Sequence, residues 1–320
     1  MTAHIQIVGR NHHRYLAACL HSCLTQTIRA PVLYVDNAST DGSVAFVREK
    51  FPEVRVVGNA ENRGYSGGHN DGLQAVQGTD IVIVLNPDVV LQPDFVAEGL
   101  VPFARERVGA VAPLLTRGEG STALQSDVVD AYGDVLQKSL RAVNHYAGPA
   151  LSDISNFDPP WGYTGAAAFL RRAALADIAL NGESFDEDLF AYREDVDVSW
   201  RLRLRGWEIV GAPKARATHA RAVRPGRKKD PLVARLSWRN YYLVLVKNAP
   251  LGVLIRFFPW IFLEDLARDI QWLVTPALWP AFPGLLRLLP RFLRKRVLVQ
   301  SRASVAPLAL GQLGRVRPIV

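Results

Sequence analysis

The first hundred residues alternate between short aliphatic runs and segments that have the period of an amphipathic helix. The aliphatic runs predict strands buried on both faces, and they occupy residues 5–8, 32–35, 54–57 and 81–85. Helix-like segments lie between or after them, at residues 14–24, 43–50 and 69–76. Strands that alternate with helices in this way predict βαβ units. We therefore expect an α/β fold with a mixed, mostly parallel sheet and helices on both faces.

The pattern changes after this region. Residues 113–160 are polar and weakly periodic, which predicts loops and short strands, and an apolar core segment returns at residues 162–178. Val196 and Trp200 then follow at helical spacing, and Gly206 marks the end of that helix. A short strand is expected at residues 208–210.

The last hundred residues form a second region. The basic stretch "RAVRPGRKKDP" predicts a loop or boundary, so we expect one domain over residues 1–220 and a helical region over residues 221–320. The longest charge-free run, residues 270–286, contains three prolines, and we expect no membrane-spanning helix there.

Two interpretations of this helical region remain open. Its helices lie on an anionic membrane, with Phe, Trp and Leu inserted, or they pack on the sheet or on a second subunit in a homodimer. In the first case, basic side chains near the end of the region would contact headgroups: Arg287, Arg291, Arg294, Lys295 and Arg296.

The charge balance favours anionic partners. Lys and Arg number 38 against 30 Asp and Glu, a formal charge of +8. Because the basic residues near the C-terminus are interleaved with large apolar ones, we expect no nucleic-acid partner. Cys19 and Cys23 lie four apart in a predicted helix and indicate packing, and the first residues lack the pattern of a signal peptide. We expect a cytoplasmic protein, peripheral on the inner face of the plasma membrane.

Polar side chains follow three of the predicted strands directly. Asn11 comes after the first, Asp36 and Asn37 after the second, and Asn86 and Asp88 after the fourth. Ligands of open α/β sheets bind beyond the carboxyl ends of the strands. A carboxylate there can accept hydrogen bonds from a base or sugar, or bind a hard divalent cation. Ordinary turn chemistry is the alternative.

The segment after the third strand, "NAENRGYSGGHNDGL", is rich in glycine. Gly64, Gly67 and Gly68, with Arg63 beside them, would let the backbone approach a phosphate closely. The segment matches neither a dinucleotide-binding fingerprint nor a P-loop. Loop flexibility alone is the other interpretation.

Three acids stand within "REDVDVSW", at Glu194, Asp195 and Asp197. Acids in the first turn of a helix interact well with its dipole, which is a sufficient structural reason for some of them. Clustered carboxylates also suit a general base, because each raises the pKa of its neighbours. His219, after the next strand, is either a structural histidine or a metal ligand.

Taken together, five motifs resemble family 2 inverting glycosyltransferases of the GT-A fold, and within them the rhamnosyltransferase-like branch that builds bacterial polysaccharides. The resemblance covers roughly residues 4–220. The motifs are "VDNASTDGS", "ENRGYSGGHNDGL", "LNPDVVLQPDF", "WGYTGAAAFLRR" and "FDEDLFAYREDVDVSWRLRLRGW".

The resemblance implies a nucleotide-sugar site and a divalent cation, Mg²⁺ or Mn²⁺. Asn86 and Asp88 stand at the family's DxD motif, with Asn86 in place of its first Asp and Asp88 as the metal ligand, and His219 falls near the metal and diphosphate. The residues implied to bind the nucleotide-sugar are Asn11, Asp36, Asn37, Arg63, Gly64, Gly67, Gly68 and Asn86. At Asn11 the chain departs from the family, whose first strand ends in Thr/Ser-Tyr-Asn instead of Gly-Arg-Asn.

The resemblance also implies the chemistry. Asp195 matches the catalytic base, with Glu194 beside it, and Trp161, Thr164 and Gly165 match a segment on the acceptor side. We expect inverting transfer of rhamnose or a similar hexose from a dTDP-, UDP- or GDP-linked donor. The acceptor would be a hydroxyl of a glycan or a polyprenyl-diphosphate-linked molecule.

Two other functions remain as alternatives. A nucleotidyltransferase would share the α/β fold and metal carboxylates, but its glycine-rich basic signature belongs directly after the first strand, where the chain has "GRNHHRYL". A non-catalytic membrane scaffold with this fold is the second alternative, and it is raised by Asn86.

Overall fold

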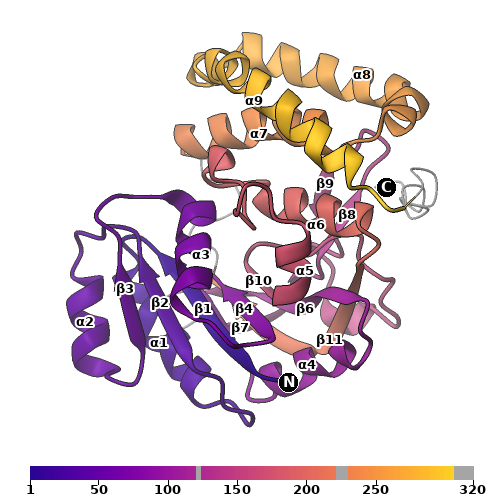
Figure 1. Ribbon diagram of the computed structural model, residues 1–320. Helices are drawn as coiled ribbons and strands as arrows, with labels where there is room; N and C mark the ends of the chain where they lie inside the picture. The colour runs from indigo at the N-terminus through magenta and orange to yellow at the C-terminus, as the bar shows by residue number, and fades with distance from the viewer. Residues whose placement is uncertain (120–123, 221–229, 306–320) are drawn as a thin grey trace.

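Nine strands form one mixed sheet in the computed structural model, which describes residues 1–119, 124–220 and 230–305 (Figure 1). Their order is β3-β2-β1-β4-β10-β6-β11-β5, and β7 pairs with β6. Six strands run in one direction, while β5, β7 and β10 run against them. The strands are β1 (Ala3–Gly9), β2 (Val32–Asp36), β3 (Arg55–Gly58), β4 (Ile81–Leu85), β5 (Val89–Leu91), β6 (Val108–Glu119), β7 (Leu124–Ala131), β10 (Ala167–Arg171) and β11 (Glu208–His219). A separate ribbon pairs β8 (Asp134–Leu136) with β9 (Ala142–Asn144).

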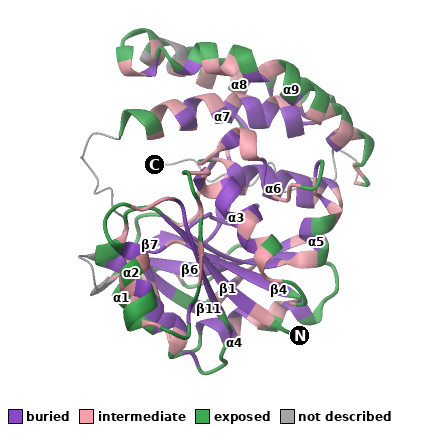
Figure 2. Cartoon of the chain, turned by 60° about the vertical axis from the view of Figure 1, so that its left-hand side comes forward, coloured by how far each residue is buried: buried purple, intermediate pink, exposed green. Residues whose placement is uncertain are grey.

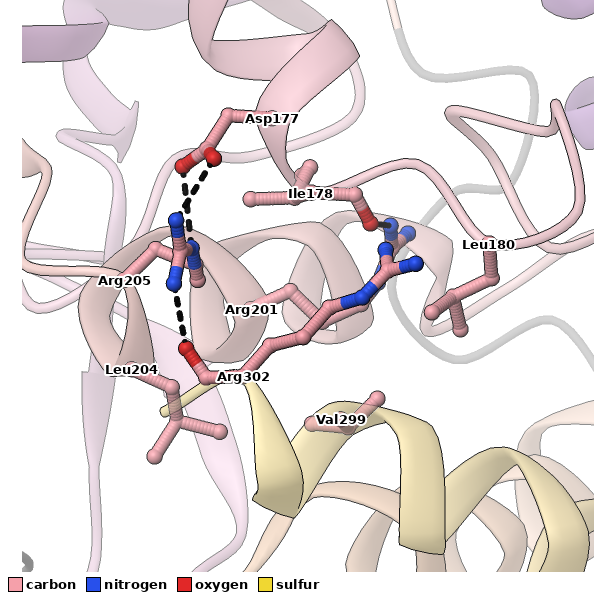
Figure 3. A pocket seen from close by; sticks show the side chains of 8 residues that line it. All are labelled: Asp177, Ile178, Leu180, Arg201, Leu204, Arg205, Val299 and Arg302. Atoms are coloured by element: carbon pink, nitrogen blue, oxygen red, sulfur yellow. Dashed lines mark hydrogen bonds and ion pairs between the residues drawn. The ribbon is translucent and has the colours of Figure 1, made fainter. Parts of the chain in front are cut away.

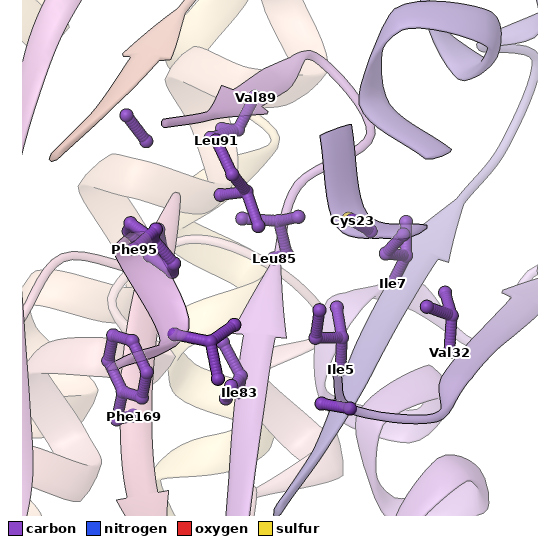
Figure 4. Packing of buried hydrophobic residues seen from close by; sticks show 14 of the residues in the cluster. Ile5, Ile7, Cys23, Val32, Ile83, Leu85, Val89, Leu91, Phe95 and Phe169 are labelled. Carbon is purple, nitrogen blue, oxygen red and sulfur yellow. The ribbon is translucent and has the colours of Figure 1, made fainter. Parts of the chain in front are cut away.

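Helices cover both faces of this sheet (Figure 1). The helices are α1 (His13–Leu24), α2 (Ser43–Lys50), α3 (Gly64–Ala75), α4 (Phe95–Leu100), α5 (Arg172–Asp177) and α6 (Glu194–Leu204). Alternate side chains of β4 explain the two layers, because successive residues of a strand point to opposite faces. Ile83 and Leu85 pack in the cluster under α1 and α4 (Figure 4), while Val82 and Val84 pack under α5 and α6. The expected α/β fold is confirmed.

Three boundaries differ from the sequence-based predictions. The glycine-rich segment was predicted as a loop up to residue 68, but α3 already begins at Gly64. The strand predicted at residues 208–210 continues to His219, and residues 113–160 contain long β6 and β7 pairing. Glycine permits the helix: a Cβ at Gly68 would lie 2.5 Å from Val8 Cγ1, so only glycine allows α3 this close to β1.

Three further helices stack above α6 (Figure 1), namely α7 (Pro231–Asn248), α8 (Leu251–Leu273) and α9 (Ala281–Ser301). Trp200 of α6 shares one hydrophobic cluster with Tyr241 of α7 and Phe292 of α9. A core therefore continues from the sheet region into these helices. The predicted boundary at residue 220 remains a prediction, and residues 221–229 lie outside the described residues.

Within the described part of the chain, none of the helices has the length and apolarity needed to cross a bilayer.

Candidate functional site

The loops after β1 and β2 lie at the carboxyl edge of the sheet and are joined by hydrogen bonds. Asp36 accepts hydrogen bonds from the Ser39 amide, at 2.8 Å, and from the Tyr34 hydroxyl, at 3.1 Å. Asn11 Oδ1 accepts from the Thr40 amide at 2.8 Å. These contacts are turn chemistry, and they fix the loop backbones that would face a nucleotide. The predicted base contacts of Asn11 and Asp36 remain predictions.

Asn37 and the start of α3 are joined in the same way. Asn37 is buried, and its Nδ2 donates to the Gly64 carbonyl at 2.7 Å. The Gly67 amide donates to the Arg63 carbonyl at 3.2 Å, and Gly68 lies inside the helix against β1. The amides that the sequence pattern assigned to a phosphate therefore serve the helix in this structure.

Arg63 is likewise committed to protein partners. Its guanidinium lies 3.1 Å from Asp71 and 2.9 Å from Glu187, and the side chain is partly exposed. Glu187 belongs to the segment that leads into α6. Arg63 therefore ties α3 to that segment, and a nucleotide contact from this side chain remains a prediction.

The end of β4 meets the end of β11. Asp88 is buried, and its Oδ1 lies 3.4 Å from His219 Nε2. The other ring nitrogen of His219, Nδ1, lies 2.9 Å from Asp130 Oδ2 on β7. A carboxylate–histidine–carboxylate row results, with the middle ring held on both sides. Asn86 begins the turn before Asp88, and its amide donates to the Ala166 carbonyl at 2.9 Å.

The electrostatics of this row favour its charged form. Burial alone would raise the pKa of Asp88, but the hydrogen bond and charge of His219 outweigh burial and lower it. Burial alone would lower the pKa of His219, but its hydrogen bonds to Asp130 and Asp88 raise it to about 9. The ring is therefore a cation near neutral pH, and it can exchange its proton for another cation.

Asp88 and His219 suit a divalent cation in their donor atoms. A carboxylate oxygen and an imidazole nitrogen face each other, and Asp130 orients the ring from behind, as carboxylates do for the histidine ligands of metal sites. Nowhere among the described residues, this place included, do three His, Cys, Asp or Glu side chains converge as a metal cage. An ion here would therefore take part of its coordination from phosphates and water, as Mg²⁺ commonly does.

A second group of acids lies at the start of α6. Asp195 accepts hydrogen bonds from the Gly165 amide, at 2.8 Å, and from the Val196 amide, at 2.8 Å. A Cβ built on Gly165 would lie 3.3 Å from Glu194 Oε1 and 3.4 Å from Asp195 Oδ2. The backbone at Gly165 therefore lies beside both carboxylates, and the Tyr65 hydroxyl donates to the Gly165 carbonyl at 2.9 Å.

Burial outweighs the charge of Arg193 at these acids. Burial raises the pKa of Asp195, although its two amide hydrogen bonds and the charge of Arg193 oppose the shift. Burial and the charge of Asp195 raise the pKa of Glu194 well above its ordinary value, and Glu194 Oε2 has no hydrogen-bond partner among the described residues. Asp134 on β8 shows the same direction, because burial and the charge of Asp195 raise its pKa.

The segment from Gly165 to Ala166 connects the two groups. Gly165 donates to Asp195, and the next residue, Ala166, accepts from the amide of Asn86 at the end of β4. The structure therefore brings together the predicted metal end and the predicted base across two residues of backbone. Thr164 is buried at the same place and pairs with Ala167.

Asp197, two residues after Asp195, has a different environment. Its carboxylate lies 2.8 Å from Arg201 and 2.7 Å from Lys247 Nζ, and all three side chains are at most 2% exposed. Burial would raise the pKa of Asp197, but these two cations lower it. Lys247 also pairs with Asp186. Asp197 is therefore part of a buried ion network that attaches α6 to α7.

Trp161 does not line a surface. Its side chain is 2% exposed, and its ring packs edge-on against Trp200 with 5.2 Å between centroids. The indole therefore fills the space beneath α6, and the place of Trp161 in the acceptor-side segment remains a prediction. Acceptor contacts from Thr164 and Gly165 remain predictions.

A small cavity lies at the other end of α6, far along the helix from Asp195 (Figure 3). Its arginines already have partners: Arg205 pairs with Asp177 and donates to the Arg302 carbonyl, and Arg201 donates to the Ile178 carbonyl. These contacts attach the end of α9 to α6, so the cavity is structural. It is lined by Asp177, Ile178, Leu180, Arg201, Leu204, Arg205, Val299 and Arg302.

Sequence reasoning missed Asp130, Tyr65 and Lys247. Asp130 lies in the weakly periodic region, and Lys247 looks like an ordinary helix residue. Only Tyr65, inside the glycine-rich motif, carried a usable signal.

Comparison with known proteins identifies the family and the fold of the chain. The family model described as "Glycosyl transferase family 2" matches residues 5–178. N-acetylglucosaminyl-diphospho-decaprenol L-rhamnosyltransferase of Mycobacterium tuberculosis is 29% identical over 220 residues, which is 62% of this chain and 69% of that protein.

Among solved structures, GalNAc-T7 with UDP, GalNAc and Mn²⁺ gives a TM-score of 0.60 at 16% identity, over 77% of this chain and 48% of that one. S. aureus TarS 1-349 with UDP gives 0.57 at 16% identity, over 98% and 88%. These likenesses establish the GT-A fold. With the family match over more than half of its length, the chain belongs to glycosyltransferase family 2.

Proposed function

We propose that this glycosyltransferase moves a sugar, rhamnose or a similar hexose, from a nucleoside-diphosphate donor to a hydroxyl of a polyprenyl-diphosphate-linked acceptor, with inversion at the anomeric carbon. The single observation that carries the proposal is the placement of Asp195 against Gly165, one residue from the contact with the end of β4. The name of the M. tuberculosis relative supports both the sugar and the lipid-linked acceptor.

Asp195 has the properties of a general base in this proposal. The amides of Gly165 and Val196 fix the orientation of its carboxylate, and each oxygen keeps a further lone pair for an acceptor proton. The raised pKa brings the group closer to the pKa of a useful base at neutral pH. Glu194 is buried beside Asp195. When its carboxyl group is protonated it is neutral, so the site then holds one negative charge fewer.

The transfer is one displacement. The acceptor oxygen bonds to the anomeric carbon from the face opposite the diphosphate, and its proton passes to Asp195. The bond between the anomeric carbon and the diphosphate oxygen breaks in the same step, and the nucleoside diphosphate leaves with that electron pair. No covalent enzyme intermediate forms, so the configuration inverts.

Asp88 and His219 are the residues that would hold a divalent cation, with Asp130 orienting the imidazole ring. Such a cation, when bound, neutralises charge on the leaving diphosphate. The Mn²⁺ in the structure of GalNAc-T7 supports this assignment. Asn86 contributes its backbone to the turn, which presents Asp88 as the only carboxylate of the motif.

The first experiment identifies the donor. Thermal shift with dTDP-, UDP- and GDP-linked sugars in the presence of Mn²⁺ should single out one donor class, and that donor is then used for transfer to an N-acetylglucosaminyl-diphosphate-lipid analogue.

The variant Asp195→Asn tests the base. We expect it to slow transfer by about 10²–10⁴-fold, because general-base catalysis contributes that much, while donor binding changes little. Asp153→Asn, an exposed aspartate, is the matched control and should transfer at the parental rate. Full activity in Asp195→Asn would refute the base assignment, and no transfer with any donor by the parent chain would favour a binding role.

A further inference from the structure

The outermost helix, α8, has many exposed residues (Figure 2), and large apolar side chains are prominent among them. Seven large side chains recur at intervals of three and four residues, which places them on one face of the helix. Each is between 49% and 68% exposed. We call them the outer stripe: Leu251, Ile255, Phe258, Phe262, Leu266, Ile270 and Leu273.

The opposite face of α8 is firmly attached to the protein. Val253 and Phe257 are buried in the cluster shared with α7 and α9. Glu264 forms an ion pair with Arg141 at 2.9 Å, and the Arg268 guanidinium lies over the Tyr241 ring at 4.5 Å. These contacts fix the rotation of α8 about its own axis. The outer stripe, on the opposite face, therefore points away from the protein.

Exposed apolar side chains are concentrated in this region. Of 20 large hydrophobic residues that are exposed in the described part of the chain, 15 lie between Leu251 and Val297. Single exposed apolar residues are normal on protein surfaces, but a contiguous patch marks an interaction site. The patch therefore requires a partner.

The distribution of charged residues indicates what kind of partner binds the outer stripe. Residues 231–320 carry 13 Lys and Arg against 3 Asp and Glu, so the remaining 230 residues carry 25 against 27. The net positive charge of the chain therefore lies in residues 231–320, which include the outer stripe. Arg256 on α8 and Arg287 and Arg294 on α9 are all exposed.

We propose that the outer stripe inserts into the interface of an anionic lipid bilayer, with Arg256, Arg287 and Arg294 on the headgroup phosphates. A helix with one apolar face and nearby arginines binds in this way, lying in the plane of the membrane. A second copy of the chain fits less well, because a two-fold interface through this face would bring arginines of the two copies together. The inference goes beyond the proposed transfer and does not depend on it.

Helix α9 is attached to the segment that leads into α6. Arg291 and Lys295 of α9 each lie 2.9 Å from Asp188, in the segment that leads into α6. These ion pairs link α9 to the segment that precedes Asp195 in the chain.

Vesicle co-sedimentation of the full chain tests the proposal. Vesicles of phosphatidylcholine alone are compared with vesicles that also contain phosphatidylglycerol, and we expect binding to the second kind. The triple variant Ile255→Gln/Phe258→Gln/Phe262→Gln should bind at least about tenfold more weakly, because three inserted side chains are lost. Its melting temperature should match that of the parent, since these positions are exposed.

Two control variants distinguish binding through the outer stripe from non-specific hydrophobic binding and from non-specific electrostatic attraction. Val101→Gln/Leu232→Gln removes exposed apolar residues outside the stripe and should bind as the parent does. Arg287→Gln/Arg294→Gln should lose about tenfold in affinity for anionic vesicles, whereas the exposed pair Arg29→Gln/Arg48→Gln should lose much less.

Three results would overturn the proposal: a parent chain that stays in the supernatant with anionic vesicles, a stripe variant that sediments as well as the parent, or a dimer that the stripe variant dissociates without any lipid binding. Vesicle binding by a chain that transfers no sugar would refute the proposed function and leave this inference intact.

Discussion

Asp195 and Asp197 are two residues apart on one helix and have opposite environments. Asp197 is fully buried and lies within ion-pair distance of Arg201 and Lys247, and these cations lower its pKa. Asp195 is half-buried and has backbone amides as its hydrogen-bond partners, and burial raises its pKa. The first carboxylate is stabilised as an anion, while the second retains affinity for a proton.

The difference shows that two acids of one motif can have different roles, one in stability and one in the reaction. A carboxylate that is neutralised by buried cations stabilises the fold and has little remaining basicity. A carboxylate held only by amides can accept a proton from a substrate. The comparison therefore predicts that changes around Asp197 affect stability and that changes around Asp195 affect the reaction.

The largest effect is expected from Lys247→Met. The change leaves Asp186 and Asp197 buried without this cation, and breaking a buried pair in this way costs about 3–5 kcal/mol. Urea denaturation measures the loss. Lys214→Met, at an exposed lysine, is the control and should stay within about 0.5 kcal/mol of the parent. Equal stability of the two variants would mean that the network contributes nothing.

Asp130 extends the comparison to a carboxylate that acts through another residue. Asp130→Asn should weaken Mn²⁺ binding in the presence of nucleoside diphosphate by about 10–100-fold, because the orientation of the His219 ring is no longer fixed. Calorimetry measures the affinity. Asp127→Asn, an exposed aspartate on the same strand, should bind Mn²⁺ as the parent does. If Asp130→Asn bound Mn²⁺ with unchanged affinity, Asp130 would have no role in the metal site.

The pH dependence of transfer should follow Asp195. The base must be ionised, so the rate falls as pH decreases through its raised pKa, and the acidic limb lies above the ordinary range of an aspartate. Arg193→Gln should move that limb to higher pH, because the charge of Arg193 opposes the shift. Rate profiles of both proteins provide the test, and an acidic limb below the aspartate range would contradict the assignment.

The smallest expected effect is a gain in stability. Burial raises the pKa of Glu194, so the folded state binds a proton more tightly than the unfolded state, and stability is lost as pH rises through this range. Glu194→Gln removes that loss and should stabilise the protein at pH 8 by roughly 1 kcal/mol, or about 2 °C in Tm. Below the pKa of an unfolded glutamate the gain should vanish. A loss of stability at pH 8 would mean that the charge of Glu194 stabilises the fold.

The sequence predicted β1, β2 and β4 well, because their side chains are buried on both faces and the aliphatic runs are unbroken. It predicted the same burial for β3, which is partly exposed because it lies at the edge of the sheet. It also predicted which strand ends carry polar groups, and Asp88 and His219 do meet at one edge. The glycine-rich segment was assigned to a loop because glycine disfavours helices, but close packing of α3 on β1 overrides that propensity.

The different environments of Asp195 and Asp197 could not be predicted from the sequence. Both are acids in a first helical turn, and the partner that separates them, Lys247, lies 50 residues later in another helix. Asp130 was missed for the same reason, since its role depends on contact with His219, 89 residues away. Tertiary contacts of this range leave no local pattern.

Titration of individual carboxylates tests the central claim most directly. In protein labelled with ¹³C at aspartate carboxyl carbons, the signals of Asp195 and Asp197 are assigned by their loss in Asp195→Asn and Asp197→Asn. The account predicts that Asp195 takes up its proton at a pH above the ordinary aspartate range, while Asp197 remains ionised below that range. A reversed order, or identical titration of the two residues, would contradict it.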